Sequence, residues 1–216
     1  MRAVLIAAKQ LALAKTRLRG VLPAVSQRGA LAEAMFLDVL DAALSAQASD
    51  RVSVVTCDPR LMMLARNAGA IVINEEYPRG LNVAVALGTT QLTSAGATCV
   101  CTLLSDIPLV TGEDIDVALG AMPTGQRGVV LVPSRDFSGT NIIVRQPADV
   151  IATQFGRFSL IRHIDDCRRW GIECQIVRLE RPALDLDVPA DLREFERFHS
   201  VTNTQAHLAR LSLVQS

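Results

Sequence analysis

The sequence predicts a single-domain α/β fold, in which helices cover an open, mostly parallel mixed sheet to give three α/β/α layers. Strand-like apolar runs alternate with helical stretches along the chain, and repeated β-then-α units of this kind build such sheets. The chain has 216 residues, of which 50% are hydrophobic and 20% charged. This is the size and composition of one globular domain rather than of a disordered or fibrous protein.

The first half of the chain opens with a continuous apolar run at residues 3–8, which is typical of a strand buried on both faces. Ser26 is expected to cap the next helix, in which apolar residues recur at helical spacing from Leu31 to Ala43. The same criteria predict strands at 52–56, 70–73 and 98–104, and helices at 61–68, 82–92 and 112–122.

The second half continues the alternation, with strands at 129–132, 142–144 and 172–177, and helices at 160–170 and from Pro189 onward. Residues 201–216 are polar with weak periodicity, so they are expected to form a C-terminal tail or a partner-binding helix. In open α/β sheets the ligand binds at the carboxyl ends of the strands. The loops that follow those ends are therefore where functional residues are expected.

The charge balance excludes some classes of function. There are 22 Lys+Arg against 22 Asp+Glu, and a net charge of zero argues against nucleic-acid and membrane-surface partners. No apolar run approaches the roughly 20 residues of a membrane span, and the N-terminal run is too short for a signal peptide. The five cysteines lack the spacing of a zinc or redox site, so they are expected to be thiols in a reducing cytoplasm.

A basic segment at residues 7–20 follows the first predicted strand. It holds the chain's two lysines, Lys9 and Lys15, together with Arg17 and Arg19, whereas all other cationic residues are arginines. Cations at the mouth of a sheet suit a polyanion such as a triphosphate, although a solvated basic face would have the same composition. The segment has neither P-loop nor dinucleotide-fingerprint spacing.

Three carboxylates follow predicted strand ends or extended segments. Asp106 comes directly after the apolar run at 98–104, and Asp185 and Asp187 alternate with leucines. In an extended chain the latter two point to one face about 7 Å apart. Their repulsion favours a bound cation, and hard carboxylate oxygens suit magnesium. Asp191, in contrast, is expected to cap the last helix.

Two polar turns complete the set of candidate sites. Gly139 and Thr140 lie in the stretch 136–141, which fits close approach of a ligand or an ordinary hairpin turn. Ser159 follows Gly156 at the start of a predicted helix, where it would cap the helix or help its amides hold an anion. His163, on that helix, is expected to be a packing or capping residue.

No segment of the sequence supports a nucleophilic triad. The chain has few histidines, three in all, and no GxSxG motif. That absence suits a reaction in which a phosphate oxygen of one substrate is the nucleophile. Attack on an α-phosphate then requires charge neutralisation and in-line placement, which lysines, arginines and magnesium supply.

Six stretches together resemble the 2-phospho-L-lactate guanylyltransferase family, whose bacterial members act on phosphoenolpyruvate or 3-phospho-D-glycerate. They are KQLALAKTRL, EEYPRGLNVAVALG, LLSDIPLV, DFSGTN, FGRFSLIRH and LDLDVPADL, in family order. The resemblance implies a nucleotide-diphospho-sugar transferase-like domain over residues 1–200. It also implies that GTP and a phosphorylated three-carbon acid yield a diphospho-guanosine ester and pyrophosphate, for coenzyme F-420 biosynthesis.

The resemblance also implies a role for individual residues. The implied catalytic residues are Lys15, Arg17 and Asp106. The implied nucleotide-binding residues are Lys9, Lys15, Gly80, Asn82 and Ser105. The implied acid-binding residues are Thr140, Gly156 and Ser159, and the implied magnesium ligands are Asp106, Asp185 and Asp187.

The sequence departs from the family pattern at three positions: Ala8 replaces a common Pro, Phe158 a usual Gly, and Val188 a helix-capping Thr. A bulky ring at Phe158 is expected to reshape the acid pocket, which bears on the acceptor more than on the reaction. Two alternatives stay open: a nucleotidyltransferase of the molybdopterin or sugar-phosphate type, and a non-catalytic nucleotide-binding module. A homodimer is compatible with each hypothesis.

Overall fold

The computed structural model describes residues 1–125 and 127–215. A seven-stranded sheet has the strand order β3-β2-β1-β4-β6-β5-β7. The strands are β1 (Arg2–Ala7), β2 (Arg51–Thr56), β3 (Ile71–Asn74), β4 (Cys99–Leu104), β5 (Gly128–Pro133), β6 (Thr140–Gln146) and β7 (Glu173–Ile176). Strand β6 runs antiparallel to β4 and β5, and every other pairing is parallel. The expected mostly parallel mixed sheet is confirmed.

The α-helices are α1 (Val25–Ser45), α2 (Pro59–Asn67), α3 (Leu81–Ser94), α4 (Gly112–Gly120), α5 (Ser159–Trp170), α6 (Pro189–Phe195) and α7 (Asn203–Gln215). The prediction that Ser26 caps the first long helix is wrong. Helix α1 already begins at Val25, and the side-chain oxygen of Gln27 accepts a hydrogen bond from the Ala24 N–H at 3.1 Å. The predicted helix is correct, but the side chain that caps its start is Gln27, which accepts from the N–H of Ala24.

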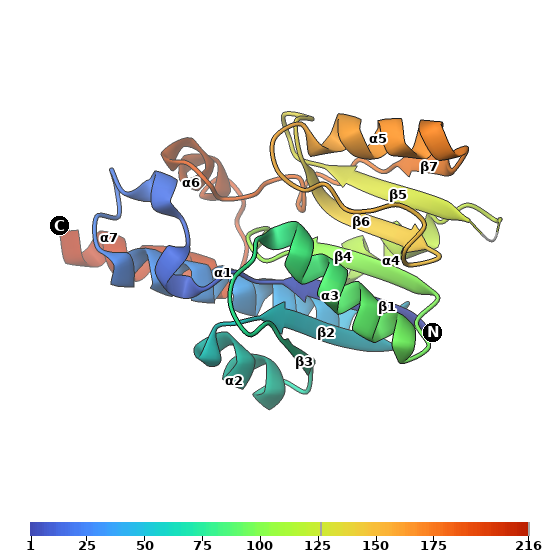
Figure 1. Cartoon of the computed structure of the whole chain (residues 1–216). Coiled ribbons are helices and arrows are strands. Elements are labelled where there is room, and N and C mark those ends of the chain that lie inside the picture. Colours follow the sequence, from blue (N-terminus) through green and yellow to red (C-terminus); the bar gives the residue numbers. More distant parts are fainter. Residues whose placement is uncertain (126, 216) are drawn as a thin grey trace.

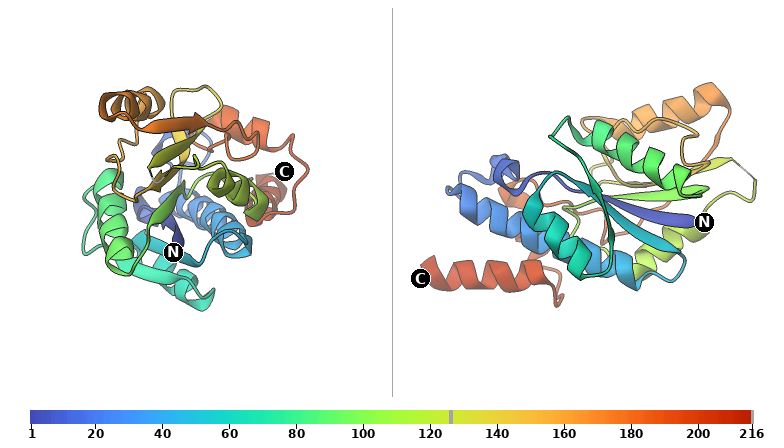
Figure 2. Two further views of the ribbon diagram at one scale, coloured as in Figure 1. Left: turned by 90° about the vertical axis from the view of Figure 1, so that its right-hand side faces the viewer. Right: turned by 60° about the horizontal axis from the view of Figure 1, so that its bottom comes forward.

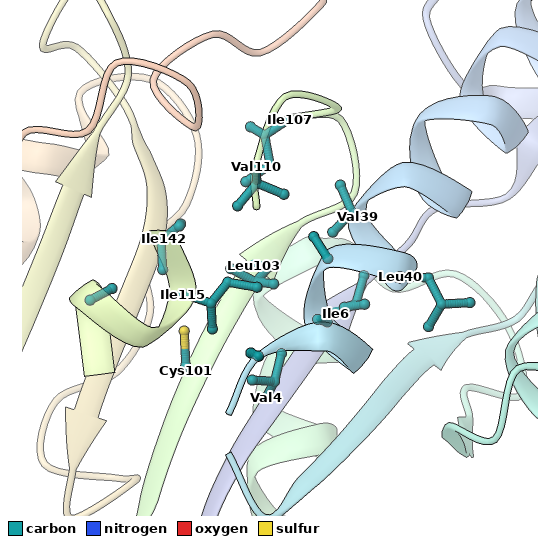
Figure 3. Packing of buried hydrophobic residues seen from close by; sticks show 14 of the residues in the cluster. Val4, Ile6, Val39, Leu40, Cys101, Leu103, Ile107, Val110, Ile115 and Ile142 are labelled. Atoms are coloured by element: carbon teal, nitrogen blue, oxygen red, sulfur yellow. The ribbon is translucent and has the colours of Figure 1, made fainter. Parts of the chain in front are cut away.

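Helices cover both faces of the sheet (Figures 1 and 2). On one face α1, α2 and α4 pack over alternate strand residues, and Figure 3 shows Val4 and Ile6 of β1 in the same buried cluster as Val39 of α1 and Ile115 of α4. On the other face α3 and α5 pack over the strand residues that point in the opposite direction. Because side chains alternate along each strand, the sheet presents an apolar surface on both faces.

The segment predicted to form a C-terminal tail or a partner-binding helix contains helix α7, which packs against α1 of the same chain (Figure 1). The buried Asp38 carboxylate on α1 accepts hydrogen bonds from the backbone N–H groups of Asn203 and Thr204, at 2.6 and 2.9 Å. Leu208 and Leu211 pack against a cluster that includes Leu31 and Met35. A carboxylate that is remote in sequence thus accepts from the first backbone N–H groups of α7. The weak periodicity of residues 201–216 does not reveal this contact.

Among the described residues, no helix is both long and apolar enough to cross a membrane.

Candidate active site

A cleft of about 800 Å³ lies at the carboxyl ends of β1 and β4. Its wall also includes the extended segment 183–187, because the Leu186 N–H donates to the carbonyl of Asp106 at 3.1 Å. Ten of the predicted site residues line the cleft: Lys9, Lys15, Arg17, Ser105, Asp106, Thr140, Gly156, Ser159, Asp185 and Asp187. Gly80 and Asn82 do not line it.

Lys15 lies between two of the predicted metal-binding carboxylates. Its Nζ is 2.7 Å from Oδ2 of Asp106 and 2.8 Å from Oδ1 of Asp187. The Lys15 side chain is 6% exposed, whereas that of Arg17, 3.3 Å from the other oxygen of Asp187, is 72% exposed. Lys15 is also held at a positive φ of 51°, which is unfavourable for a residue other than glycine. The cleft therefore holds one sequestered and one solvated cation beside the same carboxylate.

The charges in this cluster shift one another's pKa values. Burial lowers the pKa of Lys15, but attraction to Asp106 and Asp187 outweighs burial, so the pKa is raised above its usual value. The same ammonium holds the pKa of Asp187 below its usual value, against the effect of burial. Among the described residues Asp185 forms no ion pair, and burial together with Asp106 and Asp187 raises its pKa to about 6. Two of the three carboxylates, Asp106 and Asp187, thus share one buried ammonium, and Asp185 lies beside them without an ion pair among the described residues.

The donor set suits a divalent cation. Oδ1 of Asp106 is buried and has no hydrogen-bond partner, so this cluster contains an unused hard oxygen ligand. Within residues 1–125 and 127–215, however, no three carboxylates, imidazoles or thiols converge at metal-ligand spacing. The ammonium of Lys15 lies between two of the predicted ligands instead.

Asp191 caps the segment that carries these carboxylates. Its Oδ2 accepts hydrogen bonds from the backbone N–H groups of Asp187 and Val188, at 2.9 and 2.8 Å. The expected capping role of Asp191 is confirmed, because it accepts from the backbone at the start of α6. Val188 itself makes no side-chain capping bond, so the donors that a Thr hydroxyl would accept from have no side-chain acceptor at this position.

A buried hydrogen-bond network holds the predicted acid-binding residues. Oγ of Ser159 accepts from the Thr140 N–H at 2.9 Å, so Ser159 holds β6 and is not the N-cap of α5. Oγ1 of Thr140 is 3.0 Å from Nδ1 of His163, and Nε2 of His163 accepts from the Gln154 N–H at 2.8 Å. Residue type alone indicated a packing role for His163, and its contact with Thr140 has no local sequence signal.

Asn82, implied to bind the nucleotide, has its side-chain amide bound to the backbone of Phe155. Its Nδ2 donates to the Phe155 carbonyl at 3.1 Å, and its Oδ1 accepts from the Phe155 N–H at 2.7 Å. Gly80 precedes α3 at a φ of 101°, a conformation that favours glycine. Both residues therefore fix the start of α3 and the loop before Gly156.

Phe158, which departs from the family pattern, lies outside the lining of the cleft. Its side chain is 52% exposed and is not part of the cleft lining. The guanidinium carbon of Arg157 lies 4.6 Å from the centre of its ring, and Arg157 does line the cleft. Phe158 therefore adjoins the cleft through its contact with Arg157 and through the backbone, where it has a positive φ of 58° directly before Ser159.

The geometry separates two kinds of chemistry within one cleft. Lys9, Lys15 and Arg17 accompany the three carboxylates, whereas the neutral donors around Thr140 lie where β6 begins. A cationic region suits a polyphosphate, and fixed neutral donors suit a smaller anion.

Comparisons with known proteins agree with this geometry. Residues 1–215 match the family described as Guanylyl transferase CofC like. The phosphoenolpyruvate guanylyltransferase of Conexibacter woesei is 39% identical over 179 residues, covering 83% of this chain and 80% of the relative. The 3-phospho-D-glycerate guanylyltransferase of Phenylobacterium zucineum is 39% identical over 187 residues, covering 85% and 84%.

Solved structures show the same fold. A Desulfovibrio desulfuricans protein assigned to the nucleotide-diphospho-sugar transferases superposes with a TM-score of 0.76 at 18% identity, covering 98% of this chain and 95% of that one. A cytidylyltransferase from Leptospira borgpetersenii gives a TM-score of 0.62 at 13% identity, covering 99% and 94%. The chain belongs to the Guanylyl transferase CofC-like family and is a nucleotidyltransferase of the guanylyltransferase class.

Proposed function

We propose that this enzyme transfers GMP from GTP to a phosphorylated three-carbon acid, with magnesium as cofactor, in the cytoplasmic formation of coenzyme F-420. The acid is phosphoenolpyruvate, 3-phospho-D-glycerate or 2-phospho-L-lactate, of which the first two are named for relatives of this chain. The observation that carries the proposal is the buried Lys15 ammonium between Asp106 and Asp187 in a cleft large enough for both substrates.

The reaction requires no nucleophile from the protein. A phosphate oxygen of the acid attacks the α-phosphorus of GTP, a new P–O bond forms, and the bond to the β-phosphate breaks to release pyrophosphate. Lys9, Lys15 and Arg17 would neutralise the triphosphate, and the polar network at Thr140, Gly156 and Ser159 would orient the acid.

Magnesium would be held by Asp106, Asp185 and Asp187, whose charges exceed that of the single buried ammonium beside them. When bound, the ion supplies charge neutralisation on the phosphates. The unpartnered oxygen of Asp106 supports this assignment, because a buried carboxylate oxygen without a donor is costly.

The proposal is tested by measuring pyrophosphate release with each acid in the presence of GTP, CTP or ATP. We expect release with GTP and magnesium, and its loss when EDTA removes the metal. Faster turnover with CTP or ATP would favour the molybdopterin or sugar-phosphate type of enzyme. Tight GTP binding without release under any condition would favour a non-catalytic binding module.

A further inference from the structure

The imidazole of His163 is fixed in one tautomer by its surroundings. Its side chain is buried, and the Gln154 N–H donates to Nε2, so Nε2 carries no proton. Burial, together with the nearby Arg145 and Arg162, lowers the pKa of His163 to about 4, so the ring is neutral at neutral pH. Its one proton therefore lies on Nδ1, which faces Oγ1 of Thr140 at 3.0 Å.

This tautomer determines what Thr140 offers to a ligand. A hydroxyl has one proton and two lone pairs, and the Nδ1–H of His163 occupies one lone pair. The proton of Thr140 itself must then point elsewhere, and the described residues contain no acceptor bonded to it. Ser159 holds the backbone of Thr140 at the same time, and Thr140 lines the cleft.

We propose that His163 is a positioning residue that fixes the Thr140 hydroxyl as a hydrogen-bond donor to the phosphorylated acid. The inference rests on the proposed function, in which that acid binds near Thr140. Ionised phosphate and carboxylate oxygens only accept hydrogen bonds, so a hydroxyl held as a donor suits either group. The hydroxyl is thereby prepared before the substrate arrives.

Two substitutions separate the two contacts of the ring. In His163→Asn the side-chain N–H stands in for Nδ1–H and keeps the contact with Thr140, whereas His163→Gln can reach Gln154 but lacks that donor. We expect His163→Gln to raise the KM for the acid by up to about tenfold, because the Thr140 hydroxyl is kept but no longer fixed as a donor, and the upper bound is the loss of one hydrogen bond to a charged group. The KM for GTP should be unchanged. His163→Asn should recover most of that loss. His199→Asn, at an exposed histidine, is the matched control.

A double-mutant cycle tests whether the effect passes through the hydroxyl. Thr140→Val removes the hydroxyl at similar volume, so His163→Gln should no longer change the KM for the acid in that background. If His163→Gln raises the KM equally in both backgrounds, or raises the KM for GTP as much, the inference is wrong.

A measurement on the ligand-free protein separates this inference from the proposed function. Long-range ¹H–¹⁵N spectra of the His163 ring should show a proton on Nδ1 at pH 7. A proton on Nε2 would overturn the inference even in a fully active guanylyltransferase. A protein with the expected tautomer that releases no pyrophosphate would contradict the proposed function instead.

Discussion

Lys15 illustrates what a single residue contributes to this site. The segregation of both lysines in one loop predicted a role for it, because every other cation in the chain is an arginine. Its partners are 91 and 172 residues away in sequence, so no local pattern could reveal them. The compact ammonium fits between two carboxylates, where a planar guanidinium would require a different geometry.

Asp106 is expected to be essential for turnover and dispensable for folding. Asp106→Asn keeps the shape of the side chain but removes the charge that faces Lys15 and the proposed metal. We expect kcat/KM to fall by at least about 100-fold, with an unchanged circular dichroism spectrum. Asp165→Asn, at an exposed position on α5, is the control. Near-normal turnover of the Asp106 variant would remove this carboxylate from the reaction.

Asp185 is expected to make the protein less stable as the pH rises. Its pKa is raised from 3.8 to about 6, so between these values the folded chain binds this proton more tightly than the unfolded chain. The free energy of unfolding therefore falls as pH rises through this window. Asp185→Asn should increase the free energy of unfolding by up to about 3 kcal/mol at pH values above this range, and should change it little at pH values below the range.

Urea unfolding at pH 4 and pH 7.5 measures this difference. An equal effect of Asp185→Asn at both pH values would show that the carboxylate is not destabilised in the folded protein. The control is again Asp165→Asn, whose carboxylate is solvated and pairs with its helical neighbour Arg168.

At the scale of elements, strands and helices with strong apolar patterns were predictable. The run at the start of the chain forms β1, and the alternation of Cys99 and Cys101 places both thiols on one face of β4, as side-chain alternation requires. The short 3₁₀ helices Leu11–Leu13 and Thr16–Leu18 were not predicted, because they follow from backbone packing of the basic loop. One contact that holds this loop, from the Leu11 N–H to Asp58, crosses 47 residues.

Helix α7 depends on a contact that its own sequence lacks. Asp38→Ala leaves the first N–H groups of the helix without their acceptor, which should cost about 1–2 kcal/mol of stability and speed hydrogen exchange at residues 203–206. Asp38→Asn should restore much of the protection, since asparagine also caps helices. Asp41→Ala, exposed on α1, is the control. Unchanged exchange in Asp38→Ala would show that α7 is held by its apolar contacts alone.

At the scale of the whole molecule, the topology brings the separate motifs together. Parallel strands β1 and β4 end at the same edge, and the segment before α6 returns across that edge beside Asp106. The rule for open α/β sheets predicted the edge and the loops to search, and the family resemblance supplied the residue roles. It could not predict which of them bind one another, because Lys15 with Asp187 and Thr140 with His163 meet only through tertiary packing.

The central claim is that one cleft joins GMP to a small phospho-acid. The most direct test incubates the enzyme with GTP, magnesium and all three acids together, and identifies the nucleotide product by mass. We predict the guanosine diphospho-ester of one of the acids, with one pyrophosphate released per product and no product from Asp106→Asn. Unchanged GTP, or hydrolysis of GTP without an acid adduct, would contradict the proposal.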